Sequence, residues 1–147
     1  MPGPIKISSS SQCRPVDGDT GMTMGSAMDA AWGKLSDFEG WPAWIPAVNG
    51  ARLLGETVPG RGARLEIDFG ADPEEFTIAH WEPSRRLALL RQADGYRIAY
   101  AFDFHGEENQ LCLDATVEVQ CTGFRRLLTI PLLRRHHHRC QLILSAL

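Results

Sequence analysis

The sequence predicts an α+β domain in which an antiparallel sheet is covered by one long C-terminal helix. Apolar residues recur at helical spacing over 26–35, at strand spacing over 52–119, and again at helical spacing over 123–147. A sheet with one apolar face needs a covering layer, and only the last segment is long enough to supply it. A sheet that curls around a helix also tends to leave a cavity for a small ligand.

Length and composition place the chain among ordinary globular domains. Its 147 residues suffice for one domain, and 44% of them are hydrophobic and 22% charged. The start of the sequence does not resemble a signal peptide, and no apolar run approaches the roughly 20 residues of a membrane span, so we expect a cytoplasmic protein. The net charge of −3 argues against a nucleic-acid partner.

The cysteines give no sign of a metal site. Cys13, Cys112, Cys121 and Cys140 fit neither a C-x-x-C pattern nor zinc-ligand spacing. His136 and Cys140 are four residues apart, but two ligands do not make a site. We therefore expect no metal, no cofactor, and thiols that are reduced and mostly buried.

Residues 1–20 are rich in Ser, Gly, Pro and Asp and predict a flexible N-terminal extension, so that the folded domain would span 21–147. A short strand is expected at 21–24. In the helix that follows, Ser26 and Asp29 have the spacing of a capping box. Its apolar stripe is Met28, Ala31, Trp32 and Leu35.

The segment 36–46, S-D-F-E-G-W-P-A-W-I-P, is the densest in aromatic residues. Gly40 and Pro42 end the first helix, and a second short turn of helix is expected at 41–45. Here Trp41 would form the wall of a pocket, and Trp44 would either join it or pack the turn.

Six strands are expected between this segment and the terminal helix, at 52–57, 62–69, 75–82, 86–92, 96–104 and 111–119. Strict alternation over 62–69 and 96–104 indicates strands with one buried face. The dipeptide Asp94-Gly95 is a strong hairpin signal.

The segment 123–147 returns to helical spacing, with Pro131 either starting or kinking the helix. Its expected apolar stripe is Leu128, Leu132, Cys140, Leu144 and Leu147. Basic residues crowd the same segment: Arg125, Arg126, Arg134, Arg135 and Arg139. They fit the solvated side of the helix, or else a weak docking face for anionic lipid or an acidic partner.

Four stretches together resemble a known superfamily. They are S-A-M-D-A-A-W-G-K-L-S-D-F-E-G-W-P-A-W at 26–44, G-A-R-L-L-G at 50–55, P-G-R-G-A-R-L at 59–65 and W-E-P-S-R-R-L at 81–87. With them, residues 21–147 resemble the START-like (SRPBCC) superfamily, and within it the polyketide cyclase/dehydrase and lipid-transport branch.

The resemblance implies the helix-grip fold. In that fold a curved antiparallel sheet of about seven strands wraps around a long C-terminal helix, with two short helices after the first strand. The strand expected at 21–24 would be the seventh. The resemblance also implies a hydrophobic ligand pocket, but the fold does not choose among cyclases, plant allergens and lipid-transfer proteins.

Motif matching tests the cyclase reaction residue by residue. The pocket tryptophan of the superfamily's aromatic-polyketide cyclases falls on Trp41, and two large pocket residues fall on Tyr96 and Tyr100. Their pocket tyrosine, proposed catalytic arginine and nearby serine fall on Val48, Trp81 and Ala79. The positions that shape a pocket are therefore retained, while the polar groups assigned to chemistry are replaced.

Tyr100 and His136 are the candidate catalytic residues. Tyr100 lies on the inner face of its strand, and its phenol can donate a hydrogen bond to a ligand carbonyl. His136 falls on the apolar stripe of the terminal helix, where it could act as a general acid or base. Both also fit structural roles, as a core tyrosine and a histidine at the helix edge.

The candidate ligand-binding residues are Trp41, Trp44, Trp81, His80, Arg91, Tyr96 and Tyr100. Strand alternation points His80 inward, whereas the resemblance points Trp81 inward, and a bulge near the strand end would favour Trp81. Arg91 shares its strand's inner face with Leu87 and Leu89 and could hold a ligand anion, or it could lie exposed.

Two functions follow from these residues. In the first, the chain binds a small hydrophobic, aromatic or polyketide-like molecule in an internal cavity and cyclises or dehydrates it. The alternative is a non-enzymatic carrier of a lipid or hydrophobic metabolite, with a weak membrane-surface contact through the basic C-terminal helix. A third hypothesis is a partner-binding domain that keeps the fold without a ligand.

Overall fold

The computed structural model describes residues 5–16, 21, 23–55 and 58–147. Its elements in chain order are β1 (Lys6–Pro15), α1 (Met24–Ser36), the 3-10 helix η2 (Phe38–Gly40), α2 (Trp41–Trp44), β2 (Gly50–Leu54), β3 (Arg64–Asp68), β4 (Glu74–Glu82), β5 (Arg86–Ala93), β6 (Tyr96–Glu107), β7 (Gln110–Cys121), the 3-10 helix η3 (Gly123–Leu128) and α3 (Thr129–Ala146).

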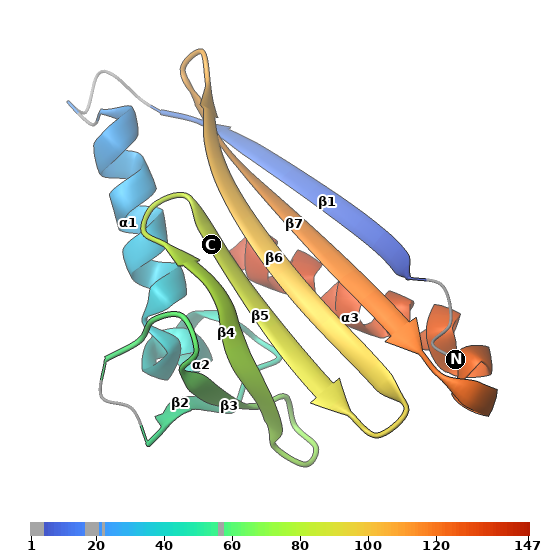
Figure 1. Ribbon diagram of the computed structural model, residues 1–147. Helices are drawn as coiled ribbons and strands as arrows, with labels where there is room; N and C mark the ends of the chain where they lie inside the picture. Colours follow the sequence, from blue (N-terminus) through green and yellow to red (C-terminus); the bar gives the residue numbers. More distant parts are fainter. Residues whose placement is uncertain (1–4, 17–20, 22, 56–57) are drawn as a thin grey trace.

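Within these residues, seven strands form one antiparallel sheet in the order β1-β7-β6-β5-β4-β3-β2. Figure 1 shows α3 lying across one face of the curved sheet, with α1 and α2 at the end where β2 to β4 lie. This arrangement confirms the predicted α+β helix-grip fold, with its long C-terminal helix and the short helices after the first strand.

The first strand is not where the sequence placed it. Lys6–Pro15, inside the segment expected to be a flexible extension, form β1 and pair with β7 over the whole strand. The strand expected at 21–24 is absent in the described part of that segment, because Met24 already begins α1. The serine-rich composition concealed β1, which is an edge strand with mostly exposed side chains and so needs no apolar alternation.

The start of α1 also differs from the prediction by three residues. Thr23 is the N-cap, and its hydroxyl oxygen accepts a hydrogen bond of 3.1 Å from the backbone N–H of Ser26. The predicted cap, Ser26, is therefore inside the helix. The predicted buried stripe is confirmed at Ala31, Trp32 and Leu35.

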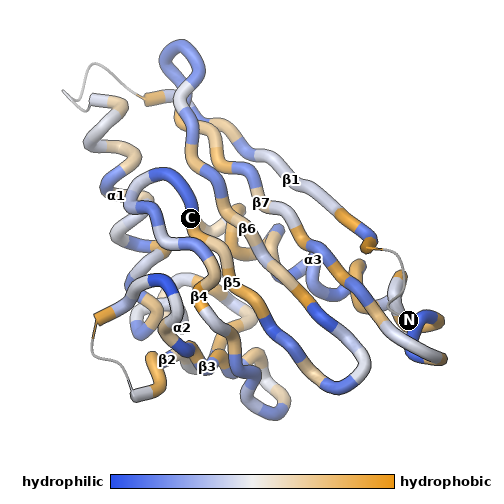
Figure 2. Tube along the Cα trace, in the orientation of Figure 1, coloured by the Kyte–Doolittle hydropathy of each residue, from blue (hydrophilic) through white to orange (hydrophobic). Residues whose placement is uncertain are grey.

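The strand interior follows the predicted alternation. Figure 2 shows hydrophobic and hydrophilic residues alternating along the long strands. On β6 the inner residues Ile98, Tyr100 and Phe102 are fully buried, and on β3 so are Leu65 and Ile67. Their side chains form one core with those of α1 and α3.

Helix α3 begins at Thr129 after the 3-10 turn η3, and Pro131 lies in its first turn, where a backbone N–H has no helical acceptor. The predicted stripe is buried at Cys140 and Leu144, whereas Leu128 is exposed because it precedes the helix. Arg139 is also buried, so the prediction that all five arginines are solvated is wrong for this residue.

The three consecutive histidines of α3 face three different directions. His136 is buried under the sheet, His137 lies toward β1, and His138 is exposed. The His137 ring shares hydrogen bonds of 2.8 Å with the Ser8 hydroxyl and 3.4 Å with the Ser10 hydroxyl. Serine side chains of β1 therefore tie this edge strand to the helix.

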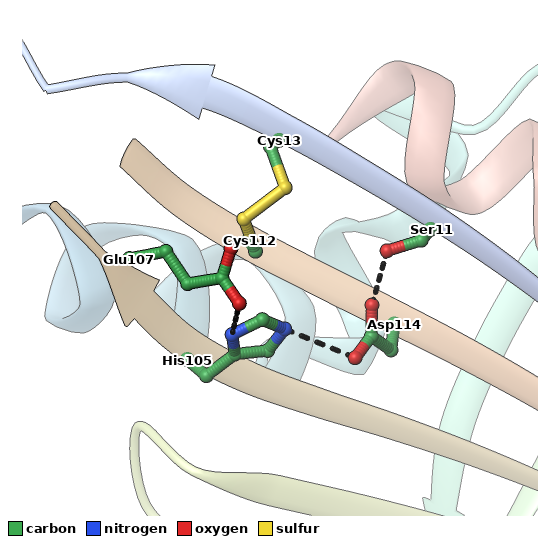
Figure 3. The surroundings of a disulfide bond; sticks show 6 residues. All are labelled: Ser11, Cys13, His105, Glu107, Cys112 and Asp114. Carbon is green, nitrogen blue, oxygen red and sulfur yellow. Dashed lines mark hydrogen bonds and ion pairs between the residues drawn. A yellow bond between two sulfur atoms is a disulfide. The ribbon is translucent and has the colours of Figure 1, made fainter. Parts of the chain in front are cut away.

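The cysteine prediction is half wrong. Cys121 and Cys140 are free and buried, as expected, but Cys13 on β1 and Cys112 on β7 form a disulfide (Figure 3). The bond links directly paired residues and joins positions 99 residues apart in the sequence. Because disulfides persist mainly in oxidising compartments, the cytoplasmic location stays a prediction that this bond does not favour.

A polar cluster lies beside the disulfide on neighbouring strands (Figure 3). The Ser11 hydroxyl donates a hydrogen bond to Asp114, and His105 contacts Asp114 at 3.0 Å and Glu107 at 3.9 Å. Serine and histidine both contact the carboxylate and not each other, so the cluster lacks the nucleophile–base contact of a catalytic triad. It cross-links β1, β6 and β7 at the surface.

None of the helices in the described part of the chain combines the length and apolarity needed to cross a membrane.

Candidate functional site

The segment 36–46 contributes to an aromatic group at one end of the interior. We call this group the aromatic end: Trp32, Phe38, Trp41, Trp44 and Trp81. The Trp41 indole N–H donates a hydrogen bond of 2.8 Å to the carbonyl oxygen of Leu35, which anchors α2 to the end of α1. The Trp41 ring packs edge-on against Phe38, with 5.3 Å between ring centroids, and is fully buried. Trp44 is half-buried, with the Lys34 ammonium 4.8 Å from its ring centroid.

Trp81, and not His80, faces the interior. The register between β4 and β5 shifts between Ile78 and His80, which inserts Ala79 as a bulge and reverses the alternation after it. Trp81 then packs edge-on against Trp32 at 5.0 Å between ring centroids. His80 is exposed and contacts Glu82 at 3.2 Å, and this hydrogen bond lowers the pKa of the Glu82 carboxyl below its ordinary value.

A buried charged cluster lies under the other half of the sheet. Glu74, the first residue of β4, forms a two-pronged ion pair with Arg139 of α3, at 3.0 and 2.9 Å between nitrogen and oxygen atoms. Arg91 of β5 contacts the same carboxylate. Glu74 and Arg139 are 6% and 7% exposed, so this pair joins sheet and helix inside the core.

Tyr100 and His136 extend the cluster. The Tyr100 hydroxyl is hydrogen-bonded to Nδ1 of His136. In the His136 tautomer that carries its proton on Nε2, the phenol donates and Nδ1 accepts. The cluster therefore combines the Glu74–Arg139 ion pair with the Tyr100–His136 hydrogen bond.

The charges of the cluster fix its protonation. Burial raises the pKa of Glu74, but the hydrogen bond and charge of Arg139 and the charge of Arg91 outweigh burial and lower it below its ordinary value. Burial lowers the pKa of His136 to about 3, with the positive charge of Arg139 as the next cause. Burial raises the pKa of Tyr100. At neutral pH Glu74 is therefore ionised, while His136 and Tyr100 are neutral.

The structure brings four predicted residues to this cluster: Arg91, Tyr96, Tyr100 and His136. Tyr96 is half-buried at its edge, with the Arg91 guanidinium carbon 5.8 Å from the Tyr96 ring centroid. Trp41, Trp44 and Trp81 belong to the aromatic end instead, and His80 belongs to neither.

Sequence reasoning missed Glu74 and Arg139, although signals for both were present. Glu74 precedes Phe76 and Ile78 at strand spacing, which places it on the inner face. Arg139 lies three residues after His136 and next to Cys140, on the buried side of α3. A buried charge of either sign requires a partner of opposite charge, and Glu74 and Arg139 are such partners for each other.

The predicted internal cavity is not open at these residues. Trp41, Tyr100, Phe76 and Phe102 each have 0% exposure, so their side chains are enclosed by other parts of the protein. The larger clefts described in the structure are at the surface, including one of about 450 Å³ between β1 and α3, bordered by Ser10, Gln12 and Gln141. The side chains predicted to line a pocket therefore pack against one another.

The described residues contain no group of three or more side chains able to hold a metal ion. What the cluster offers instead is a hydrogen-bond donor and acceptor in an apolar interior. Neutral Tyr100 can donate to a carbonyl or hydroxyl oxygen, and the Arg139 guanidinium can stabilise a negative charge.

Comparison with known structures identifies the class of fold. No family model matches the chain, and no curated protein matches its sequence. A START superfamily protein from Mycobacterium smegmatis is 14% identical in a structural match that covers 95% of this chain and 92% of that one, with a TM-score of 0.67. A major latex-like protein from Panax ginseng is 10% identical over 95% and 98% of the two chains, with a TM-score of 0.60.

A third similar structure is an aromatase/cyclase from a Streptomyces species, which is 16% identical over 81% of this chain and 70% of its own, with a TM-score of 0.55. The chain is thus an α+β domain of the helix-grip class. More specifically, it has a START-like (SRPBCC-like) fold, as the sequence motifs predicted.

Replacing Glu74 by Gln is expected to destabilise the fold, because it leaves the Arg139 and Arg91 charges buried without a carboxylate. We expect the free energy of unfolding, measured by urea denaturation at pH 7, to fall by about 3–5 kcal/mol. The neighbouring Glu75→Gln is the matched control. Glu75 is on the opposite face and half exposed in its pair with Arg64, so its loss should cost less than about 1 kcal/mol. Equal losses for the two variants would contradict the assigned role of Glu74.

Acidification should destabilise the fold through His136. Its pKa is about 3 when folded against an ordinary value of 6.5, so the unfolded chain binds more protons as the pH falls below 6.5. The free energy of unfolding should then decrease by up to about 1.4 kcal/mol per pH unit. In His136→Asn, whose amide can still accept a hydrogen bond, this slope should be smaller between pH 7 and 5, a range above the titration of Glu74.

The exposed His138 offers the control for this measurement. His138→Asn should leave the dependence of the unfolding free energy on pH as it is in the unmodified chain. If His136→Asn also left it unchanged, His136 would not be the buried neutral histidine described here.

Proposed function

We propose that the chain binds a small hydrophobic molecule with one polar end, of the aromatic or polyketide-like kind, in the interior between the sheet and α3. One observation carries the proposal. A buried ion pair, Glu74 with Arg139, and a buried hydrogen-bonded pair, Tyr100 with His136, lie in a mostly apolar core. Ligand sites in proteins combine apolar walls with a few convergent polar groups in this way.

Stability alone is a weak explanation of the buried ion pair in this cluster. Taking two charges out of water costs several kcal/mol per ion, and apolar side chains of the same volume often stabilise a core as well or better. The Glu74–Arg139 pair joins β4 to α3, and the Tyr100–His136 hydrogen bond joins β6 to the same helix three residues earlier. This cost is more easily explained if the cluster orients a polar ligand atom.

The apolar part of the ligand would lie along β6 toward the aromatic end. Phe102 and Phe104 follow Tyr100 on the inner face of this strand, and Trp32 packs against Phe104 with 6.0 Å between ring centroids. Four residues of a strand span about 13 Å. A molecule of that length could place its polar end at Tyr100 and its apolar end among Trp32 and Trp81.

Entry of a ligand requires side chains to move, because Tyr100, Phe76 and Phe102 are fully buried. The half-buried residues at the edge of the cluster mark the nearest route. They are Phe69, Arg91, Tyr96 and Leu132, from the sheet end that faces η3 and the first turns of α3. Movement of Tyr96 and Leu132 would open the interior at this edge, whereas Arg91 and Phe69 contact the Glu74–Arg139 pair and would stay in place.

The chemistry of the site favours a carrier over an enzyme. Such a carrier would bind a lipid or hydrophobic metabolite without converting it. A histidine with a pKa of about 3 is uncharged near neutral pH and is a weak base. The position of the cyclases' proposed catalytic arginine holds Trp81, which packs on Trp32.

A polyketide cyclase or dehydratase is the second candidate. It is supported by the structural likeness to an aromatase/cyclase and by the hydrogen bond between Tyr100 and His136, which could polarise a substrate carbonyl.

A pair of probes with the same apolar body tests the binding proposal. We expect acetonaphthone, which carries a carbonyl, to bind more tightly than naphthalene in titrations followed by tryptophan fluorescence. Tyr100→Phe should weaken acetonaphthone binding about fivefold, the value of one hydrogen bond, and leave naphthalene unaffected.

The only other tyrosine of the chain supplies the matched control. Tyr96→Phe removes a hydroxyl at the half-buried edge of the cluster and should change the acetonaphthone affinity less than Tyr100→Phe does. Failure of both probes to bind would refute the proposal and would leave a partner-binding domain as the remaining hypothesis.

The cyclase candidate has a separate test. Incubation with a linear poly-β-ketone should shift the products toward cyclised or dehydrated forms, as measured by mass spectrometry, and Tyr100→Phe should reduce that shift at least tenfold if the phenol polarises the carbonyl. A product distribution identical to that without protein would exclude this candidate while leaving the carrier unaffected.

A further inference from the structure

An exposed apolar patch lies on the segment that joins the sheet to α3. We call it the η3 patch: Phe124, Leu127, Leu128 and Ile130, which are 87%, 86%, 48% and 47% exposed. Four large apolar side chains within seven residues are far from the isolated exposed residues that any surface carries. Ile5 and Ile7, both more than half exposed, flank Lys6, which pairs with Val119 near the end of β7 where η3 follows.

The patch is surrounded by positive charge. Arg125 and Arg126 separate its apolar residues in the sequence, and Arg134 and Arg135 are exposed one turn of α3 further on. Residues 123–147 contain five arginines and no acidic residue, whereas all eighteen acidic residues lie before Gly123. A chain of net charge −3 therefore carries one strongly basic end.

Exposed apolar side chains next to arginines favour one class of partner, an anionic membrane. Nucleic acid would use the arginines but would gain nothing from exposed Phe124 and Leu127, which do not lie on a flat stacking surface of basic strands. A bilayer uses both: apolar side chains enter the boundary of the acyl chains while arginines meet anionic headgroups. The segment is short, so it would lie on the membrane and not cross it.

The location of the patch relates it to the interior cluster. η3 begins directly after β7, whose last residue Cys121 pairs with Tyr96, and the N–H of Thr122 bonds to the Gly95 carbonyl at 2.9 Å. Arg125 packs over the same hairpin at Gly95. Figure 1 shows η3 and the start of α3 at the sheet end where the β5–β6 hairpin lies. This is the end at which Arg91 and Tyr96 are half-buried.

We propose that the η3 patch docks the chain on anionic membranes, with Phe124 and Leu127 inserted at the acyl boundary and Arg134 and Arg135 on the headgroups. Docking there would place the half-buried edge of the interior cluster against the bilayer, so that a hydrophobic ligand could pass between them without crossing water. The docking itself does not depend on the proposed ligand function. Vesicle sedimentation tests the docking, and the titrations with acetonaphthone and naphthalene test the ligand function.

Vesicle sedimentation of the full chain tests the docking. Vesicles of phosphatidylcholine with about one third phosphatidylserine should bind the protein at low salt, and pure phosphatidylcholine vesicles should bind it at least tenfold more weakly. Phe124→Ser with Leu127→Ser should weaken binding to the anionic vesicles roughly tenfold or more, because two apolar side chains no longer leave water. Arg134→Glu with Arg135→Glu should do the same and remove the salt dependence.

Matched variants elsewhere on the surface distinguish docking through the η3 patch from the effect of any lost apolar side chain or changed charge. Val58 is 74% exposed and distant from the patch in the sequence, so Val58→Ser should bind like the unmodified chain. Arg61→Glu with Arg85→Glu makes the same charge change on exposed arginines outside the segment and should weaken binding less than the α3 pair. Unchanged melting temperatures would show that all variants are folded.

Insertion has its own readout. A Phe124→Trp variant should show quenching of its added fluorescence by brominated lipid in anionic vesicles. The proposal is overturned if the unmodified chain does not bind these vesicles at low salt, or if the Phe124 and Leu127 changes leave binding intact. It is equally overturned if sedimentation equilibrium shows that the patch is buried in a dimer that these changes dissociate.

Discussion

The ion pair between Glu74 and Arg139 is the interaction on which the interior of this protein depends. It joins the first residue of β4 to the middle of α3, across 65 residues of sequence, and both partners are more than nine-tenths buried. Because neither charge can remain in the core without the other, the pair fixes the position of α3 against the sheet. Beside this pair Tyr100 is hydrogen-bonded to His136, and burial keeps both of these side chains neutral, with the charge of Arg139 adding to the effect on His136.

A second local feature decides which side chains meet in the aromatic half. The bulge at Ala79 turns Trp81 inward and His80 outward, and Trp81 then completes an aromatic group with Trp32 and Phe38. Without the extra residue, a polar histidine would enter the apolar interior and the tryptophan would face water. The inward position of Trp81 in the aromatic group therefore depends on a single inserted residue on β4.

Periodicity predicted the parts of the fold that have one buried face. The strands over 62–69 and 96–104 and the terminal helix were found because their apolar residues alternate or recur at helical spacing. β1 was missed because an edge strand held by backbone pairing, serine–histidine bonds and a disulfide needs no apolar pattern. In the site, Tyr100 and His136 were predicted from their faces. Glu74 and Arg139 were not, since a charged residue is assigned to solvent unless its partner, distant in sequence, is known.

The interior cluster and the η3 patch lie at the same end of the sheet. The interior is closed around Tyr100, and its half-buried edge at Arg91 and Tyr96 lies where η3 joins β7 to α3. That same junction carries the exposed apolar side chains of the η3 patch and the basic residues around it. A closed apolar interior next to an exposed apolar junction is the arrangement expected when opening occurs at a hydrophobic surface, because the side chains displaced from the core then find an apolar environment instead of water.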